Sequence, residues 1–294
     1  MDSIISQTYS NWELIVSDDG SSDGTVDIIN SYMQKDARIK YYHNTQKHGC
    51  AGNFESALKY CTGDYIAFCD QDDVWTPDHL DYLYSIIGDK SIAFADAEAV
   101  DVNLNTLNFF WGEKFLITEE HLNKDLLLHL IFLNFVQGTA ILFRRDFLQF
   151  LPFPEALFHD HWAAIVAVLQ NGIAYSSKSI LKYRQHGNNT CGVMESSFKY
   201  KLKKLRSEVQ RRTDNYTNIE KFVCEHKDLI SPKKYQKAVK YLEIARKIIY
   251  ERNILLFNKY YDVLFWDSDR KKFFTRYLMY CILFPAARKR NSKV

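Results

Sequence analysis

Three carboxylates stand within four residues at Asp70-Gln71-Asp72-Asp73, directly after the apolar run 65–69. Carboxylates this close repel one another, and a fold accepts that repulsion when a divalent cation or a network of sugar hydroxyls compensates it. Mg²⁺ and Mn²⁺ prefer oxygen ligands, often one or two carboxylates together with substrate phosphates. The motif therefore predicts a cation site next to a phosphorylated ligand. The competing explanation is a solvated acidic turn that caps the next helix.

A second acidic turn contains Asp18 and Asp19 and follows the apolar run 12–16. The neighbouring glycines allow a tight turn from strand to helix. Either aspartate could accept hydrogen bonds from a nucleotide base or ribose. Helix capping is the competing explanation, and it accounts better for Ser22 and Asp23 than for two adjacent aspartates.

The elements that carry these turns alternate between strand and helix character. This rhythm predicts an α/β fold with a mostly parallel sheet and helices on both of its faces. Ligands bind such sheets beyond the carboxyl ends of the strands, so both acidic turns should share one site. The expected strands are 12–16, 39–43, 65–69, 92–95 and 140–143, and the expected helices are 23–32, 53–61, one that opens at 76–77, and 161–171.

The distribution of charge divides the chain in two. Residues 1–194 hold 13 Lys and Arg against 25 Asp and Glu, a net charge of −12, and residues 195–294 hold 25 against 11, a net charge of +14. Such asymmetry indicates segments with different partners. From about residue 195 the pattern is helical. We therefore expect a domain at 1–192 and a basic helical extension at 193–294.

Composition indicates a folded protein, because 47% of its 294 residues are hydrophobic and 15% are aromatic. No pair among the six cysteines has metal-ligand spacing, so we expect reduced thiols in the cytosol. The start of the chain has no secretory signal pattern. The apolar segment 277–287 is too short to span a bilayer and precedes the basic residues 288–290. It is expected to lie on a membrane surface or to pack as a final helix.

Taken in order, these motifs resemble those of a family 2 glycosyltransferase. The resemblance covers about residues 1–192 and rests on Ile15-Val16-Ser17-Asp18-Asp19-Gly20-Ser21-Ser22-Asp23-Gly24-Thr25, Gly63-Asp64-Tyr65-Ile66 and Asp70-Gln71-Asp72-Asp73-Val74-Trp75. The last of these, with Tyr183-Arg184-Gln185-His186-Gly187-x-Asn189, resembles the rhamnosyltransferase-like branch. The family implies the GT-A nucleotide-diphospho-sugar transferase fold and an in-line displacement that inverts the anomeric carbon.

The resemblance also implies roles for individual residues. On the donor side it places Asp18, Asp19, Asn53, Asp70 and Gln71. The Mg²⁺ or Mn²⁺ ion would be held by Asp72, with Asp70 and His186 as further ligands, and Asp73 would support them.

The segment His159-Asp160-His161-Trp162 matches the part of the family that supplies the catalytic base, which makes Asp160 the candidate. Asp160 could instead cap the helix that follows it, and His186 could be a surface turn residue. Gly138 and Trp162 are weaker candidates for the acceptor side, and Gly138 could equally be a packing position.

The family normally opens with a strand and a Pro-x-Tyr-Asn-type loop, whereas this sequence begins in a segment, 2–9, that matches the helix after them. We expect a start at an internal Met or a degraded copy. Either would leave backbone groups of a neighbouring strand unpaired and would lower stability and donor affinity.

The predicted activity is transfer of a sugar from a UDP- or dTDP-sugar to a cell-surface polysaccharide or lipid-linked glycan, with dTDP-rhamnose indicated by the branch resemblance alone. The basic extension predicts contact with an anionic membrane surface, hence a cytoplasmic protein peripheral to the inner face of the plasma membrane. No nucleic-acid partner is expected. One alternative is an inactive or binding-only remnant. Another is a nucleotidyltransferase, but residues 1–50 show no Gly-rich, Lys-bearing phosphate loop.

Overall fold

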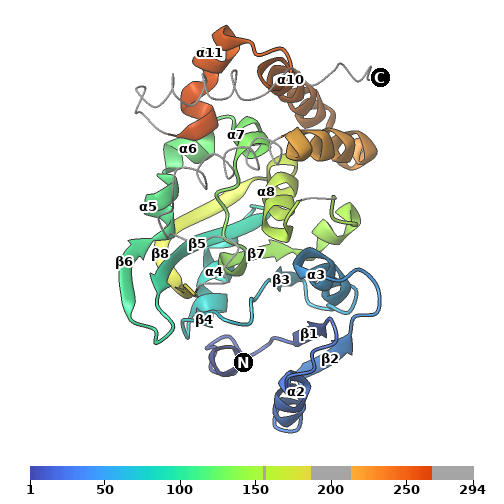
Figure 1. Ribbon diagram of the computed structural model, residues 1–294, viewed down its shortest axis with the longest axis vertical. Helices are drawn as coiled ribbons and strands as arrows, with labels where there is room; N and C mark the ends of the chain where they lie inside the picture. The colour runs from blue at the N-terminus through green and yellow to red at the C-terminus, as the bar shows by residue number, and fades with distance from the viewer. Residues whose placement is uncertain (155–156, 187–212, 267–294) are drawn as a thin grey trace. The chain divides into compact units, whose positions relative to one another are not determined.

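The computed structural model describes residues 1–154, 157–186 and 213–266 (Figure 1). The chain forms two compact units, one of Met1–Phe115 with Phe135–Gly192 and one of Leu116–Asn134 with Val193–Val294. This division differs from the predicted boundary at residues 192 and 193 in one respect: residues 116–134 belong to the second unit. The reason is packing: α7 (Leu126–Phe132) is buried along its whole length and packs on α10 and α11 of that unit.

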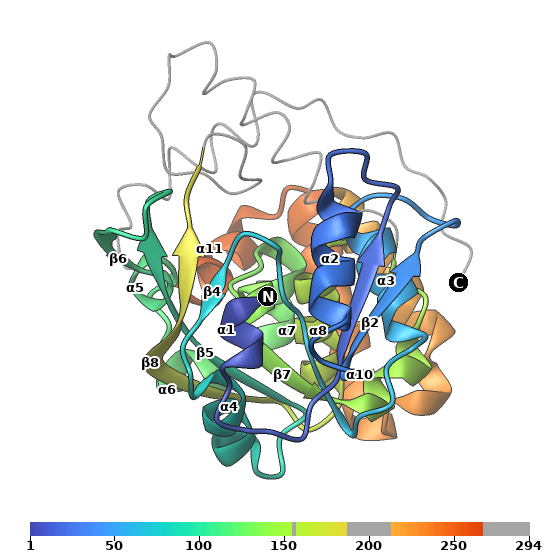
Figure 2. The ribbon, with the colours of Figure 1, turned by 90° about the horizontal axis from the view of Figure 1, so that it is seen from below.

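The first unit contains two sheets. In the smaller one, β1 (Leu14–Asp18) pairs in parallel with β2 (Ile39–His43), and α2 (Thr25–Met33) lies against β2 (Figure 2). The larger sheet has the strand order β3-β7-β5-β8-β4, with β6 also paired to β5. Its strands are β3 (Tyr65–Ala67), β4 (Val74–Trp75), β5 (Ile92–Val100), β6 (Thr106–Phe110), β7 (Ile141–Arg144) and β8 (Ile173–Arg184).

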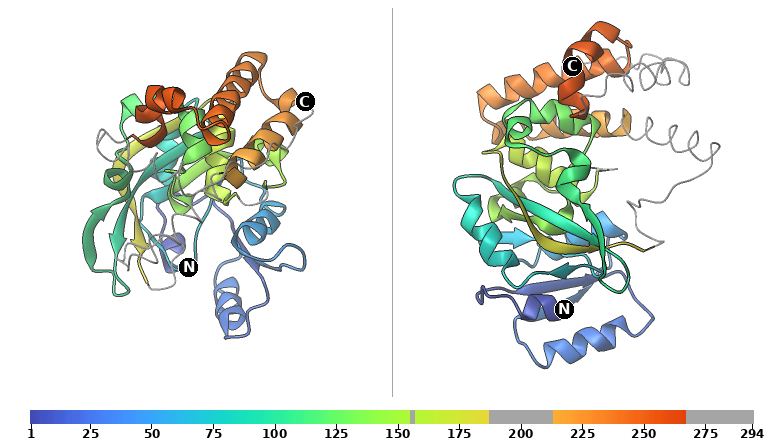
Figure 3. Two further views of the ribbon diagram at one scale, coloured as in Figure 1. Left: turned by 45° about the horizontal axis from the view of Figure 1, so that its top comes forward. Right: turned by 90° about the vertical axis from the view of Figure 1, so that its left-hand side faces the viewer.

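The larger sheet is mixed and not mostly parallel. Among its described strands only β5 and β8 pair in parallel, and they lie side by side in Figure 3, β5 in teal and β8 in yellow. The pairs β3–β7, β5–β7, β4–β8 and β5–β6 are antiparallel. A β-α-β sequence pattern identifies strands and helices, but it does not determine which strands pair or in which direction. The prediction of a mostly parallel sheet was therefore wrong for this sheet.

The helices of the first unit begin close to the expected positions. α2 starts at Thr25 because Gly24 has a positive φ of 85° and the Asp23 carboxylate accepts the Thr25 amide hydrogen. α3 (Cys50–Leu58) follows Gly49, whose φ is 91°. The remaining helical segments are α1 (Asp2–Ile5), α4 (His79–Ile87), α5 (Trp111–Phe115), α8 (His159–Leu169), and the 3₁₀ turns η1 (Gly138–Ala140) and η2 (Arg145–Phe150).

The core of this unit lies on both faces of the larger sheet. On one face α4 packs Leu83 and Ile87 against Ala93, Leu142 and Ile180 of the central strands. On the other face Trp162 of α8 contacts the rings of Phe143, Phe147 and Phe153. Alternate residues of a strand point to opposite faces, which explains why neighbouring Leu142 and Phe143 serve different layers.

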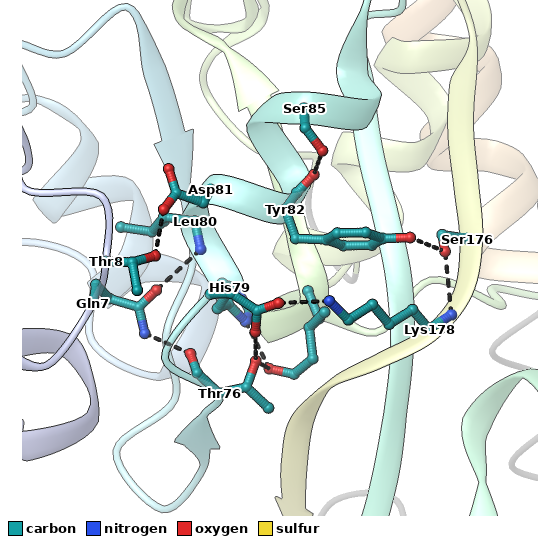
Figure 4. Close-up of polar contacts among 12 residues, drawn as sticks. Gln7, Thr8, Thr76, His79, Leu80, Asp81, Tyr82, Ser85, Ser176 and Lys178 are labelled. Atoms are coloured by element: carbon teal, nitrogen blue, oxygen red, sulfur yellow. Dashed lines mark hydrogen bonds and ion pairs between the residues drawn. The ribbon is translucent and has the colours of Figure 1, made fainter.

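The segment after α1 is fixed to α4 by a polar cluster (Figure 4). Gln7 is 7% exposed; its amide nitrogen donates to the Thr76 carbonyl at 2.7 Å and its amide oxygen accepts the Leu80 amide hydrogen at 3.0 Å. The Thr8 hydroxyl donates to the Asp81 carboxylate. A buried side-chain amide with both ends bonded anchors the chain more firmly than surface contacts would.

A hollow of about 470 Å³ lies between β1 and β3 and is lined by residues of both strands. Among the described strands β1 pairs only with β2, and β3 only with β7. The indole nitrogens of Trp12 and Trp75, two residues that line the hollow, are buried and have no hydrogen-bond partner among the described residues. The facing edges of these two strands therefore lack strand partners in this part of the chain.

The second unit is helical in its described residues. Residues 213–225 are helical, and the other helical segments of the described part are α6 (Glu119–Asn123), α7, η3 (Lys227–Leu229), α10 (Pro232–Ile249) and α11 (Ile254–Phe265). His129 of α7 stacks on Trp266, and its Nδ1 lies 2.9 Å from the Val263 carbonyl oxygen. No described helix has both the length and the apolar character needed to cross a bilayer. The segment 277–287 and the basic residues 288–290 lie outside the described residues.

Candidate functional site

The acidic loop between β3 and β4 is a concentrated negative site. Burial, and after it the charges of Asp73, Asp72 and Asp160, together raise the pKa of Asp70 to about 7. Asp160 is about 90 residues away in sequence, so only the fold brings its carboxylate to this loop. The influence of the Asp160 charge on the pKa of Asp70 indicates that the two carboxylates lie near each other, and their roles at a shared site stay predictions.

The Asp72 carboxylate meets the end of β8. His186 Nε2 lies 2.7 Å from Asp72 Oδ2, and the side chains keep 31% and 24% of their surface exposed, respectively. The described residues contain no group of three His, Cys, Asp or Glu side chains close enough to hold a metal ion. The expected trio of Asp70, Asp72 and His186 therefore does not assemble, although two of its members touch.

The residues present nevertheless fit a divalent cation that takes its remaining ligands from a substrate. Mg²⁺ in particular keeps several waters and is commonly bound by one or two carboxylates plus phosphate oxygens. The Asp72–His186 pair supplies one carboxylate and one ring nitrogen. The raised pKa of nearby Asp70 reflects burial first and the neighbouring negative charges second, and a cation bound there would favour the ionised carboxylate.

Asp160 lies in the first turn of α8, where the helix dipole favours a negative charge. The N-cap residue of α8 is Phe158, and the Asp160 carboxylate accepts the amide hydrogen of the next residue, His161, at 2.6 Å. The capping explanation for Asp160 therefore fails in position, because an N-cap side chain bonds an amide two or three residues later.

Gly138 brings η1 against the start of α8. A Cβ atom at Gly138 would lie 2.5 Å from His159 Nε2 and 3.4 Å from Asp160 Cβ. His159 is 5% exposed, and burial lowers its pKa to about 3, so the ring is neutral. The close approach favours a packing role for Gly138 and leaves its acceptor-side role a prediction.

Cys50, at the first position of α3, connects the two acidic turns. Although the residue as a whole is exposed, partial burial of its thiol and the charges of Asp70, Asp160 and Asp19 together raise the thiol pKa to about 11. Its sulfur lies 3.9 Å from His159 Nδ1. Asp19 thus lies near the same place as Asp70 and Asp160. No spacing in the sequence signalled Cys50 or His159 as part of this site.

Both aspartates of the first acidic turn already accept hydrogen bonds from the protein. Burial alone would raise the pKa of Asp18, but the hydroxyl and amide of Ser21 and the amide of Gly20 outweigh it and lower this pKa. Asp19 accepts from Asn44 Nδ2 and from the Gly49 amide, each at 2.7 Å. Asp19 therefore fixes the loop between β2 and α3.

The other predicted site residues lie in different environments. Asn53 donates to the Ser17 carbonyl at 2.8 Å, while its buried amide oxygen has no hydrogen-bond partner. Gln71 is exposed beside Asp70. Trp162 is 0% exposed and its indole nitrogen donates to the Phe150 carbonyl. A fully buried side chain cannot contact an acceptor, so the prediction for Trp162 was wrong: it belongs to the core.

Comparisons with known proteins bear on this arrangement. The family model described as Glycosyl transferase family 2 matches residues 1–151. The Escherichia coli UDP-Glc:alpha-D-GlcNAc-diphosphoundecaprenol beta-1,3-glucosyltransferase WfgD is 39% identical over 105 residues, which cover 36% of this chain and 41% of that protein. The E. coli enzyme of the same printed activity, WfaP, is 31% identical over 196 residues, which cover 64% of this chain and 72% of WfaP.

The fold has a counterpart among solved structures. A crystal structure of S. aureus TarS in complex with UDP-GlcNAc superposes with a TM-score of 0.53 at 16% identity, covering 95% of this chain and 84% of that one. At this identity the likeness establishes the fold alone, and that fold is GT-A. The matched part spans only about two fifths of WfgD, but the family match and WfaP both cover enough to assign the family. The chain belongs to glycosyl transferase family 2.

Proposed function

We propose that this chain transfers a sugar from a nucleotide-diphosphate donor to a lipid-linked glycan or growing cell-surface polysaccharide, with inversion at the anomeric carbon. The observation that carries the proposal is that Asp160 packs against Gly138 of η1 and influences the pKa of Asp70, while the next residue of η1, Thr139, bonds Asp73. A UDP-sugar is the favoured donor, because WfgD and WfaP are named as UDP-Glc enzymes. A dTDP-sugar, including dTDP-rhamnose, is the second choice.

The residues divide the work between donor and acceptor. Asp160 takes the proton of the acceptor hydroxyl as its oxygen forms the new bond to C1. The bond from C1 to the diphosphate breaks on the opposite face, and the electron pair leaves with the diphosphate. Asp72 and His186, with Asp70 adjacent, would hold Mg²⁺ or Mn²⁺. When bound, the cation neutralises the charge that develops on the leaving group.

The names of two relatives and the charge of residues 195–294 support the proposed acceptor and location. WfgD and WfaP are named for an acceptor carried on diphosphoundecaprenol, a membrane lipid. Residues 195–294 carry a net charge of +14, which suits attraction to anionic lipids at the inner face of the plasma membrane. We therefore propose a peripheral enzyme that meets its acceptor at that surface.

The test is a transfer assay on the full chain with UDP- and dTDP-sugars, a diphospholipid-linked acceptor, and Mn²⁺ or Mg²⁺. Asp160→Asn should lower transfer by about 10²–10⁴-fold and leave UDP affinity nearly unchanged, because it removes only the proton acceptor. Asp72→Ala should abolish metal-dependent turnover, as should a chelator. Asp89→Asn, whose side chain is 86% exposed, is the matched control. Normal transfer by Asp160→Asn would remove that residue as the base.

A binding-only remnant is the second candidate, and the unpaired edges of β1 and β3 around the hollow favour it. Calorimetry separates the candidates in two steps. A degraded remnant binds neither UDP nor dTDP, and a binding-only protein binds one of them without transferring its sugar. Turnover with any donor rules out both.

A further inference from the structure

Asp73 is the most deeply buried carboxylate of the acidic loop, at 9% exposure. Its two oxygens accept hydrogen bonds from two other parts of the unit. Oδ2 accepts the Thr139 hydroxyl at 2.6 Å, and Oδ1 accepts the Arg184 amide at 3.1 Å. A buried carboxylate with both oxygens bonded to separate segments fixes the positions of those segments relative to its own loop.

The bond from Asp73 to Arg184 connects Asp73 with the part of β8 that leads to the Asp72–His186 pair. Arg184 Nε donates to the Asp72 carbonyl at 2.8 Å, and Nη1 donates to the Val102 carbonyl at 2.5 Å. Two residues further on, His186 meets the Asp72 carboxylate. The end of β8 is thus tied to the acidic loop at three points, and the bond to Asp73 is one of them.

The bond from Asp73 to Thr139 connects Asp73 with η1, which packs against Asp160. Thr139 is 0% exposed in η1, and its neighbour Gly138 packs against His159 and Asp160 so closely that a Cβ would overlap the His159 ring. A shift of η1 would therefore be transmitted directly to the first turn of α8. Asp73 is the side chain that bonds this segment on one side and the end of β8 on the other.

We propose that Asp73 is a positioning residue that sets the separation between the Asp72–His186 pair and the Asp160 carboxylate. This inference rests on the proposed function, in which the first pair serves the donor and Asp160 serves the acceptor. Asp73 acts through Thr139 and Arg184 and need not touch either substrate. Correct spacing matters because the acceptor oxygen, C1 and the diphosphate must lie in line, and a misplacement of about 1 Å can lower a rate by about 10²-fold.

The experiment compares Thr139→Val with Thr139→Ser. Valine keeps the shape and removes the hydroxyl, whereas serine keeps the hydroxyl. Thr139→Val should lower kcat for transfer by about 10–100-fold while KM for the donor and Kd for UDP change by less than about threefold. The Thr139→Ser variant should keep kcat within about threefold of the wild-type value. Thr8→Val is the matched control, since it removes a threonine–aspartate hydrogen bond at α4.

Each outcome decides the inference. Equal kcat for wild type and Thr139→Val overturns the positioning role and leaves the proposed function intact. A Thr139→Val chain in which kcat and UDP affinity fall together, without rescue by serine, indicates a purely structural bond and also overturns it. If the valine variant does not fold, Thr139→Cys gives the same comparison with a weak donor. A wild-type chain that transfers no sugar from any donor refutes the proposed function and the positioning role with it.

Discussion

The change Gly138→Ala should separate packing at η1 from chemistry at Asp160. The added Cβ would meet His159 Nε2 at 2.5 Å, whereas ordinary van der Waals contact begins near 3.4 Å. About 0.9 Å of movement is therefore needed between η1 and α8. His159 cannot swing out to supply it, because the side chain is 5% exposed and its ring contacts Phe54 and Phe68.

Two magnitudes follow from that displacement. Overpacking of this kind destabilises a fold by about 1–3 kcal/mol. A shift of close to 1 Å at Asp160 should lower kcat for transfer by about 10²-fold. Thermal melts measure the first effect, and transfer kinetics at saturating donor measure the second. UDP affinity should change little, since the added Cβ would meet His159 and Asp160 and not the Asp72–His186 pair.

Gly63→Ala is the matched control, because its Cβ would meet only the Tyr65 carbonyl oxygen at 3.2 Å in an exposed turn. It should melt near wild type and transfer at a normal rate. A Gly138→Ala chain that behaves like this control would refute the claim that η1 and Asp160 are in rigid contact.

Further predictions concern the turns around β1. Glu13 accepts hydrogen bonds from Lys40 and Thr62, which outweigh the effect of burial and lower its pKa from 4.5 to about 2. Its stabilisation is therefore complete above pH 4.5 and is lost as the pH falls towards 2. Glu13→Gln should lower the free energy of unfolding, measured in denaturant, by about 1–2 kcal/mol at pH 7. Near pH 2.5 the loss should be much smaller. An equal loss of stability at both pH values would contradict this role of Glu13. Asp19→Asn should loosen the loop between β2 and α3, because it weakens the bonds from Asn44 and Gly49. Calorimetry should then show UDP binding weakened by about tenfold, with kcat nearly unchanged. Unaltered UDP affinity would show that this loop does not shape the donor site.

The sequence was most informative where periodicity and turn chemistry act locally. Apolar runs that end in acidic turns placed β1 and β3 within two residues of their observed ends, and the helix predicted over 23–32 is observed over Thr25–Met33, after the Gly24 turn. A shared site for Asp160 and Asp70 was predicted from the family resemblance alone, and the effect of the Asp160 charge on the pKa of Asp70 agrees with that prediction. No local pattern specifies a contact between residues about 90 positions apart.

The incorrect predictions have one physical origin. Where the local sequence pattern allows several contacts or pairings, tertiary packing decides which of them forms. Trp162 follows Asp160 by two residues, so the helical period turns it away from the site and into the core. The donor-side roles of Asp18 and Asp19 stay predictions, and the structure adds that both carboxylates accept amide hydrogens of the protein. Strand order in the mixed sheet depends on long-range pairing that no run of residues encodes.

The central claim is that one acidic site binds a cation and a nucleotide diphosphate beside Asp160. Diffraction from crystals grown with Mn²⁺ and UDP, collected at an X-ray energy where manganese scatters anomalously, tests this directly. The account predicts a single strong anomalous peak within about 2.0–2.6 Å of an Asp72 carboxylate oxygen, bridged to the diphosphate of UDP. A manganese peak remote from Asp72, or ordered UDP with its diphosphate away from this loop, would contradict it.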